Sequence, residues 1–427
     1  MNKTLIVILL LVNGISAQQS IQQDIYEIED KLIEWRRDFH QNPELSNREF
    51  KTADKIYRHL KSLGLEVETN IAKTGVVAIL EGNHPGKVIA LRADIDALPV
   101  TERNNLEFKS MVKTTFLNTQ TGVMHACGHD THIAILMATA EVLSKHKDKI
   151  KGHIKFIFQP AEEGPPPGEE GGAKLMIKEG VLENPKVDAI FGLHINSQTP
   201  VGTIKYKTGG IMASVERFVI SVKGKQTHGS QPWSGIDPIL ISAKIIDGLQ
   251  TIISREAELT NEAAVITVGK ITSGTRFNII PESSEMIGTV RTLDPRMREM
   301  IKKRMKEMIE GIALAYGGEA SISFQNNASI TYNDESLTAQ ILPSLQTAAG
   351  KDNVAIMKAT TGGEDFSYFQ EKVPGVYFFL GGMTPGSKGS FPHHTPDFII
   401  DESGLLLGVK AFTQIAMDYL NYWFISS

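Results

Sequence analysis

The 427-residue sequence contains a single cysteine, Cys127, so the chain cannot form an intramolecular disulfide bond. It also lacks an excess of basic residues, because 44 lysines and arginines stand against 49 aspartates and glutamates. Dedicated nucleic-acid-binding proteins carry such an excess, so we expect no nucleic-acid partner. Hydrophobic residues make up 41% and charged residues 22% of the chain. These values are typical of soluble globular proteins and exclude a disordered, collagen-like or polytopic membrane chain.

Long apolar runs are absent except for one at the N-terminus. Lys3 precedes the apolar residues 5–12, a run too short to span a bilayer comfortably, and Ala17 is a plausible cleavage position. This pattern predicts a secretory signal peptide over residues 1–17, the alternatives being a first buried strand or an uncleaved anchor. We therefore expect a secreted or periplasmic protein with no membrane attachment after cleavage. In an oxidising compartment, a lone Cys127 is expected to be buried or metal-bound.

The first half of the chain has the pattern of an α/β domain. The length of the whole chain predicts two to three domains at roughly 150 residues each. Short β-rich runs alternate with helical stretches, which indicates a mostly parallel sheet covered by helices. Strands are expected over residues 76–80, 87–92, 153–158 and 189–193, and helices over 21–63 with a break at Pro43, over 132–145 and over 173–179. The second helix of the first stretch is expected to run from Asn47 to Leu63, with Gly64 as its cap.

A different pattern begins near Gly209. The expected order from Val215 to Gln325 is strand, helix, strand, strand, helix, strand, the β-α-β-β-α-β order of a ferredoxin-like unit. The α/β pattern then returns, with a helix over 335–349, a strand over 375–380 and a helix over 404–423. We therefore predict a small domain, residues 209–325, inserted into a larger discontinuous domain made of residues 20–208 and 326–427.

The densest cluster of reactive side chains spans residues 125–132. It holds three of the 12 histidines and the only cysteine. Cys127 and His129 are two residues apart, so their side chains point to the same side if the segment is extended. A thiolate and an imidazole favour a transition metal over calcium or magnesium. The alternatives are a buried structural thiol and a thiol-dependent hydrolase with Cys127 as nucleophile.

Four further residues lie where an α/β sheet places functional groups, or in a polar loop. Glu162 and Glu163 follow an apolar strand, His194 ends another strand, and His394 lies in a loop with a second histidine. Taken singly, each glutamate could equally be a solvated surface charge, and each histidine could equally be a core or surface residue without a functional role. Taken together, however, five residues supply enough metal-compatible ligands for two divalent ions that share a water: Cys127, His129, Glu163, His194 and His394. Glu162 would then act as the general base and deliver the proton to a leaving amine.

The chain resembles the dinuclear-metal amidohydrolase and exopeptidase family that includes hippurate hydrolase, aminoacylases, bacterial carboxypeptidases and indole-acetyl-amino-acid hydrolases. The resemblance rests on an ordered set of motifs that covers nearly all of the chain after the predicted signal peptide. These motifs are Arg92–Pro99, Met124–Asp130, Gln159–Gly164, Gly192–His194, Gly224–Pro238, Asn278–Pro281, Gly362–Phe369 and His394–Pro396.

The resemblance implies a role for each matching residue. Glu162 falls on the catalytic base, while Asp94 and Asp96 fall in a segment that packs behind the metals. The cofactors implied are two divalent transition-metal ions per chain, of zinc, manganese, cobalt or nickel. The residues at the metal-ligand positions are Cys127, His129, Glu163, His194 and His394.

The resemblance also implies a zinc-peptidase-like α/β catalytic domain with an inserted lid domain, which is usually the surface of a homodimer. His228 falls on a lid histidine that reaches an active site, commonly across the dimer, and would stabilise the oxyanion. Asn278 and Arg276 fall in a segment that lines the substrate pocket, where Arg276 would pair with a substrate carboxylate. His228 is followed by Gly-Ser rather than by two alanines, and Trp233 stands where a histidine is common. These departures leave the acyl and side-chain specificity open.

The function expected from these residues is hydrolysis of an amide bond next to a free carboxylate, in an N-acyl amino acid or a short peptide. One alternative is an aminopeptidase of the same architecture, which would require a free amino end instead. The other is a binding protein with an inactive site, because hydrolase folds can be recruited for recognition.

Overall fold

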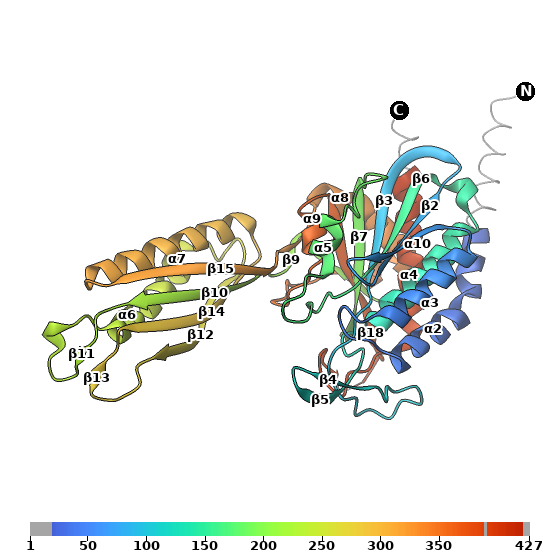
Figure 1. Cartoon of the computed structure of the whole chain (residues 1–427). Coiled ribbons are helices and arrows are strands. Elements are labelled where there is room, and N and C mark those ends of the chain that lie inside the picture. The colour runs from blue at the N-terminus through green and yellow to red at the C-terminus, as the bar shows by residue number, and fades with distance from the viewer. Residues whose placement is uncertain (1–18, 388–390, 422–427) are drawn as a thin grey trace, which may run out of the picture. The chain divides into compact units, whose positions relative to one another are not determined.

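The computed structural model describes residues 19–387 and 391–421. The predicted signal peptide, residues 1–17, and the end of the last predicted helix, residues 422–423, lie outside the described residues. No helix within the described ranges is both long enough and apolar enough to cross a bilayer. The chain divides into two compact units (Figure 1). The first comprises residues up to 207, 333–357 and from 369 onward, and the second comprises 208–332 and 358–368.

The first unit is built on an eight-stranded sheet with the order β1-β2-β6-β3-β7-β18-β8-β17. The four strands in its middle pair in parallel, whereas β1, β2 and the β18–β8 pair are antiparallel. The α/β prediction is therefore confirmed, with a sheet that is parallel at its centre and mixed at its edges. The strands are β1 (Glu66–Ile71), β2 (Gly75–Glu81), β3 (His84–Asp94), β6 (Lys151–Gln159), β7 (Ala189–Pro200), β8 (Ile204–Tyr206), β17 (Val354–Ile356) and β18 (Gly375–Met383).

Helix α4 (His129–Ser144) lies at the centre of this unit, with α2 (Glu29–Gln41), α3 (Phe50–Ser62) and α10 (Leu405–Asn421) beside it (Figure 1). Every residue of α4 up to Leu143 is buried. A helix that is apolar on all sides packs within a core rather than at a surface. Helices α5 (Gly172–Lys178) and α8 (Glu335–Ala349) belong to the same unit.

Three predicted boundaries near the candidate residues were wrong. The helix expected from Asn47 begins at Phe50, since Asn47 has a left-handed backbone with φ of 59°. Helix α4 begins at His129 rather than 132, so Cys127 and His129 are not on one extended strand. Strand β7 continues to Pro200, so His194 lies within it, two residues beyond the end of its pairing with β3. The hairpin of β4 (Lys113–Phe116) and β5 (Thr119–Gly122) was not predicted either.

The second unit has the β-α-β-β-α-β order expected from the sequence. The four strands of its main sheet pair antiparallel in the order β12-β14-β10-β15, and the buried faces of α6 and α7 join their core. Asp237 and Asp294 begin the two helices, because each carboxylate accepts an N–H of the first turn. The elements are β10 (Val215–Lys223), α6 (Pro238–Thr251), β12 (Ala264–Ser273), β14 (Ser283–Thr292), α7 (Pro295–Ala315) and β15 (Glu319–Ala328).

The division between the units differs from the predicted one at two segments. Residues 326–332 and 358–368 were predicted to belong to the larger domain, but both cluster with the second unit. Thr360 forms a β-bridge with Met212 of β9 (Gly209–Met212), and its N–H donates to the carbonyl of Ile211 at 2.9 Å. This pairing joins residues far apart in sequence, which hydrophobic periodicity does not reveal.

Candidate metal centre

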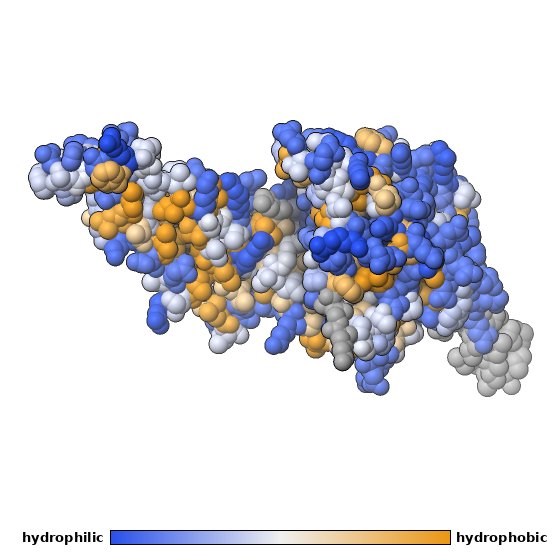
Figure 2. Space-filling view, turned by 90° about the horizontal axis from the view of Figure 1, so that it is seen from below, coloured by the Kyte–Doolittle hydropathy of each residue, from blue (hydrophilic) through white to orange (hydrophobic). Residues whose placement is uncertain are grey.

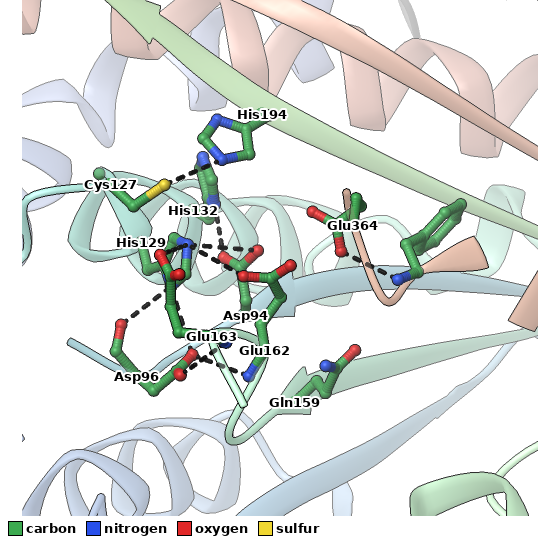
Figure 3. Close-up of polar contacts among 12 residues, drawn as sticks. Asp94, Asp96, Cys127, His129, His132, Gln159, Glu162, Glu163, His194 and Glu364 are labelled. Atoms are coloured by element: carbon green, nitrogen blue, oxygen red, sulfur yellow. Dashed lines mark hydrogen bonds and ion pairs between the residues drawn. The ribbon is translucent and has the colours of Figure 1, made fainter. Parts of the chain in front are cut away.

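The five predicted metal ligands all belong to the first unit, and the structure brings them together. Sγ of Cys127 lies 3.5 Å from Nε2 of His194 and 3.2 Å from Nε2 of His394. The same Nε2 of His394 lies 3.1 Å from Oε1 of Glu163. Figure 3 shows Cys127 and His194 facing each other, with His129 and the two glutamates beside them.

The ligand atoms form two groups that share one residue. Cys127, His129 and His194 make one group, and Cys127, Glu163 and His394 make the other. Within each group the ligand atoms all lie within 4.8 Å of one another. Thiolate, imidazole and carboxylate ligands together suit a transition metal. The cysteine is thus common to two sets of donors.

An unpaired nitrogen supports this interpretation. Nε2 of His129 is buried and has no hydrogen-bond partner among the described residues. Its nearest carboxylates are those of Asp94 at 3.8 Å, Glu162 at 3.9 Å and Glu163 at 4.0 Å. Leaving a buried polar atom unpaired costs about 1–3 kcal/mol. A metal ion would supply the missing partner, so the residues present fit the two-metal centre that the resemblance implies.

The backbone around Cys127 and His129 is fixed by Gly128. Its φ is 94°, and a Cβ at this position would lie 2.4 Å from Cγ2 of Ile195, so only glycine fits. Nδ1 of His129 lies 2.9 Å from the carbonyl of Asp96 and therefore carries its proton there. In the neutral ring, Nε2 of His129 therefore carries the lone pair that a metal ion would bind.

The turn with Glu162 and Glu163 follows the end of β6. Both carboxylate groups are largely buried, with side-chain exposures of 10% and 13%. The carboxylate of Asp96 accepts the N–H of Glu162 at 3.1 Å and that of Glu163 at 3.0 Å. Asp96 thus holds the turn with its side chain and His129 with its carbonyl, the supporting role that the resemblance implied for it.

His132 is a buried residue to which the sequence analysis assigned no role. Its Nδ1 lies 2.5 Å from Oδ1 of Asp94, and its Nε2 accepts the N–H of Ile195 at 2.9 Å. Arg92 donates to the other oxygen of Asp94 at 2.7 Å. Both ring nitrogens of His132 are therefore engaged, and its place is behind the ligands. Its spacing of three residues from His129 within a helix is the signal that could have identified it.

The loop with His393 and His394 contains two histidines with different surroundings. Nε2 of His393 accepts the N–H of Ser197 at 3.3 Å, and its Nδ1 lies 3.1 Å from the carbonyl of Cys127. His394 has φ of 64°, and its N–H donates to the carbonyl of Ala126 at 2.8 Å. This conformation turns the His394 ring toward Cys127 and Glu163, so His394 is the one with a nitrogen beside both.

Protons occupy two of the candidate ligands when no cation is bound. Burial lowers the pKa of His129, but the carboxylates of Asp94 and Asp96 outweigh it and raise that pKa to about 10. Burial also raises the pKa of Cys127 well above its usual value, and the charge of Glu163 adds to the effect. A nucleophilic cysteine needs the opposite shift. Cations bound here must displace these protons.

The three predicted residues of the inserted domain lie together in the second unit. Strand β11 (Thr227–His228) pairs with β13 (Ile279–Ile280), and the N–H of Gly229 donates to the carbonyl of Asn278 at 2.8 Å. The N–H of Ser230 donates to Nδ1 of His228 at 3.1 Å, so the ring proton is on Nε2. His228 and Arg276 are exposed. The six residues Cys127, His129, Glu162, Glu163, His194 and His394 belong to the other unit.

Known proteins similar to this chain identify its family. The model of peptidase family M20/M25/M40 matches residues 90–418, more than half of the chain. The chain belongs to this family. Among M20 relatives, the thermostable carboxypeptidase 2 of Saccharolobus solfataricus is 42% identical over 405 residues, 94% of this chain and 99% of that protein. The N-acetylcysteine deacetylase of Bacillus subtilis is 40% identical, over 91% of this chain and 97% of its own length.

A solved M20 structure is also similar to the whole chain. It is the YXEP protein of Bacillus subtilis, described as a dinuclear metal-binding peptidase. It is 38% identical and superimposes with a TM-score of 0.77, covering 92% of this chain and 99% of its own. The predicted membership in this family and its fold are confirmed.

Proposed function

We propose that the chain is a metal-dependent amidohydrolase that cleaves the amide bond of N-acyl amino acids or short peptides next to a free carboxylate. The observation that carries this proposal is the pair of donor groups that share Cys127, with the carboxylate of Glu162 3.9 Å from His129. Two divalent ions would be held by these groups, one by Cys127, His129 and His194 and the other by Cys127, Glu163 and His394. When bound, such ions polarise the scissile carbonyl and lower the pKa of water toward neutrality.

Glu162 is the base in this proposal. Its carboxylate accepts a proton from the attacking water and returns it to the nitrogen of the leaving amine. The turn that carries Glu162 is fixed through its backbone to Asp96, so the carboxylate is held in place before substrate arrives. Its neighbour Glu163 lies against His394 and serves as a ligand, which divides the two roles between adjacent carboxylates.

The second unit supplies the substrate contacts. Because Nδ1 of His228 accepts from Ser230, Nε2–H is available to donate to the oxyanion of the tetrahedral intermediate. Arg276 would pair with the substrate carboxylate and Asn278 would line the pocket, as the family resemblance implies. A guanidinium binds a carboxylate through two parallel hydrogen bonds, which suits a substrate with a free carboxyl end.

A homodimer formed by the second unit is part of the same proposal. Strand β12 is an edge of its sheet, and Val265 and Ile271 on it are 45% and 48% exposed. Ile239 and Leu240 of α6 are 46% and 47% exposed. Figure 2 shows apolar residues gathered over this unit. An exposed sheet edge with apolar side chains is a surface that proteins cover or pair.

Two relatives support a substrate with a carboxylate beside the scissile amide, although a second candidate remains. A carboxypeptidase and an N-acetylcysteine deacetylase both act on an amide next to a carboxylate-bearing residue, which supports the same choice here. An aminopeptidase of this fold is the second candidate. The thiol-dependent alternative is disfavoured because burial and Glu163 raise the pKa of Cys127.

The test is a substrate screen with the metal-free protein reloaded with zinc, manganese, cobalt or nickel. We expect hydrolysis of N-acetyl and N-benzoyl amino acids or of dipeptides. The same compounds with the carboxyl group converted to an amide should be cleaved at least tenfold more slowly, about 1.4 kcal/mol. Cleavage that instead requires a free amino group and tolerates a blocked carboxyl would identify an aminopeptidase.

Export is proposed from the sequence of residues 1–17. The short apolar run after Lys3 and the small residue Ala17 support a cleaved signal peptide. Expression of the full chain in a host with an export pathway should yield a protein whose N-terminus, read by mass spectrometry, begins at residue 18. Full-length protein retained inside the cell would contradict the proposal.

A further inference from the structure

Glu49 has a buried carboxyl group far in sequence from the candidate ligands, and it contacts the turn that carries two of the site residues. It is fully buried and immediately precedes α3. Its Oε1 accepts the N–H of Ala161 at 2.9 Å, and its Oε2 accepts the hydroxyl of Thr74 at 2.6 Å. Ala161 directly precedes Glu162, so Glu49 acts on the first residue of the turn.

Two carboxylates together bind three successive N–H groups of this turn. Glu49 accepts from Ala161, and Asp96 accepts from Glu162 and from Glu163. Figure 3 shows the Asp96 carboxylate beside the backbone of Glu162 and Glu163. With three consecutive N–H groups bound, the turn cannot rotate without breaking a hydrogen bond. The directions of the Glu162 and Glu163 side chains are fixed through their backbone.

The conformation of Ala161 is a second, independent observation. Its φ is 53°, in the left-handed region that residues with a Cβ adopt rarely. Such a conformation persists only where the surrounding structure holds it. Ala161 is buried, its N–H donates to Glu49 at 2.9 Å, and its carbonyl accepts the N–H of Gly164 at 3.3 Å. Loss of the shorter of these two bonds weakens the hold on this conformation, and a return of Ala161 to an ordinary conformation would re-aim the next two side chains.

Asn47 and Arg48, which precede Glu49, bind the far end of the segment that connects β6 to α5. Asn47 donates to the carboxylate of Glu169 and to the carbonyl of Glu170, both at 3.0 Å. Arg48 donates to the other oxygen of Glu169 at 2.6 Å. The segment before α3 therefore binds the connection between β6 and α5 at both ends, with Glu49 at the end that carries the site residues.

We propose that Glu49 is a positioning residue for Glu162 and Glu163, acting through the backbone of Ala161. This inference rests on the proposed function of the site. Glu49 touches neither the substrate nor the reacting atoms. Its side chain keeps one carboxylate aimed as a base and the next aimed as a ligand. Loss of residues that orient metal ligands typically costs about 10–100-fold in metal affinity or activity.

The test compares Glu49→Leu, which removes the acceptor for Ala161, with Glu49→Gln, whose amide oxygen can still accept that N–H. Co²⁺ binding to the metal-free protein is measured by absorption, and kcat and KM are measured at saturating Co²⁺. For Glu49→Leu we expect Co²⁺ affinity and kcat each to fall about 10–100-fold, with KM changed less than about threefold. Glu49→Gln should restore both to within about threefold of the wild type.

Two further variants separate this role from general destabilisation. Thr74→Val keeps the shape of the side chain but removes the hydroxyl that donates to Glu49. It should therefore lower Co²⁺ affinity and kcat, by a smaller factor than Glu49→Leu. If Glu49→Leu does not fold, Thr74→Val provides the test in its place. Lys155→Met is the matched control, because buried Lys155 binds the carbonyls of Val181 and Glu183 but not the turn. It should lower the melting temperature and leave Co²⁺ affinity and kcat unchanged.

Each remaining outcome contradicts a stated part of the account. Wild-type Co²⁺ affinity and kcat in both Glu49→Leu and Thr74→Val overturn the positioning role. A Glu49→Gln variant as impaired as Glu49→Leu shows that charge rather than the hydrogen bond matters, which also overturns it. A wild-type protein that binds no Co²⁺ and cleaves no N-acyl amino acid overturns the proposed function itself. The wild-type measurement thus separates failure of the proposed function from failure of the positioning role of Glu49.

Discussion

The sulfur of Cys127 lies 3.2 Å from Nε2 of His394, although 267 positions separate the two residues in the sequence. Cys127 also faces His194, so it stands between the two groups of donors. Removal of a shared ligand affects both groups. We therefore expect Cys127→Ala to lose at least one of two bound ions, measured by elemental analysis after dialysis. Unchanged stoichiometry and affinity would reduce Cys127 to a packing residue.

His393 and His394 offer a matched pair, because they are adjacent and only His394 has a nitrogen beside both Cys127 and Glu163. His394→Ala should lower metal affinity by at least tenfold, about 1.4 kcal/mol, measured by calorimetric titration of the metal-free protein. His393→Ala should change it by less than that, since both of its ring nitrogens are engaged elsewhere. The reverse order of effects would assign the ligand to His393.

Glu162 and Glu163 provide a second matched pair. Glu162→Gln should leave metal content and the fold intact and lower turnover by at least the roughly 10²–10⁴-fold that general acid–base catalysis contributes. Glu163→Gln should lower metal content instead, because Glu163 lies against His394. A metal-loaded Glu162→Gln variant with near-normal turnover would exclude Glu162 as the base.

His228 is expected to act on the oxyanion through Nε2–H. Oxyanion donors contribute about 2.7–4 kcal/mol, so His228→Ala should lower kcat by roughly 10²–10³-fold with metal content unchanged. Ser230→Ala is the control, since the backbone N–H that fixes the His228 tautomer remains. It should retain most of the activity.

A mixing experiment shows which chain supplies His228. If it acts across a dimer, mixing His228→Ala with Glu162→Gln should restore activity, because each mixed dimer then carries one site with both groups intact. A mixture no more active than its parents, with subunit exchange demonstrated, would exclude the arrangement across subunits.

Metal binding should be strongly pH-dependent. Burial lowers the pKa of His129, but Asp94 and Asp96 raise it to about 10, so at neutral pH its proton must leave before a metal binds. Burial likewise raises the pKa of Cys127, whose thiol must also ionise. Affinity should therefore increase as pH rises from 6 to 8, about tenfold per pH unit for each proton released. Calorimetry in buffers of different ionisation enthalpy counts these protons. An affinity independent of pH would mean that the site is not protonated as described.

Much of the fold could be predicted from local patterns. The strand Val215–Lys223 and the helix Glu335–Ala349 have the predicted bounds, because each has the periodicity of its element and clear residues at its ends. The start of α4 at His129 was missed. Its apolar run begins at Ile133, and the polar residues before it are buried only because they belong to the site.

The ligands could be named from the sequence because they recur in order in a known family. The residues that hold the ligands in place could not be named in this way. Glu49 and Ala161 are 112 positions apart and carry no metal-binding signature. Asn47 reads as part of a helix by periodicity, yet its contacts with Glu169 and Glu170 draw it into a left-handed conformation. Hydrogen bonds between distant segments decide such positions, and local propensity does not contain them.

The central claim is that two ions share Cys127, and anomalous X-ray scattering from crystals of the zinc-loaded protein tests it most directly. The account predicts two anomalous peaks per chain, both about 2.3 Å from Sγ of Cys127, the usual zinc–sulfur distance. One peak should have His129 and His194 as further ligands, and the other Glu163 and His394. A single peak, or a second peak with no bond to Cys127, would contradict it.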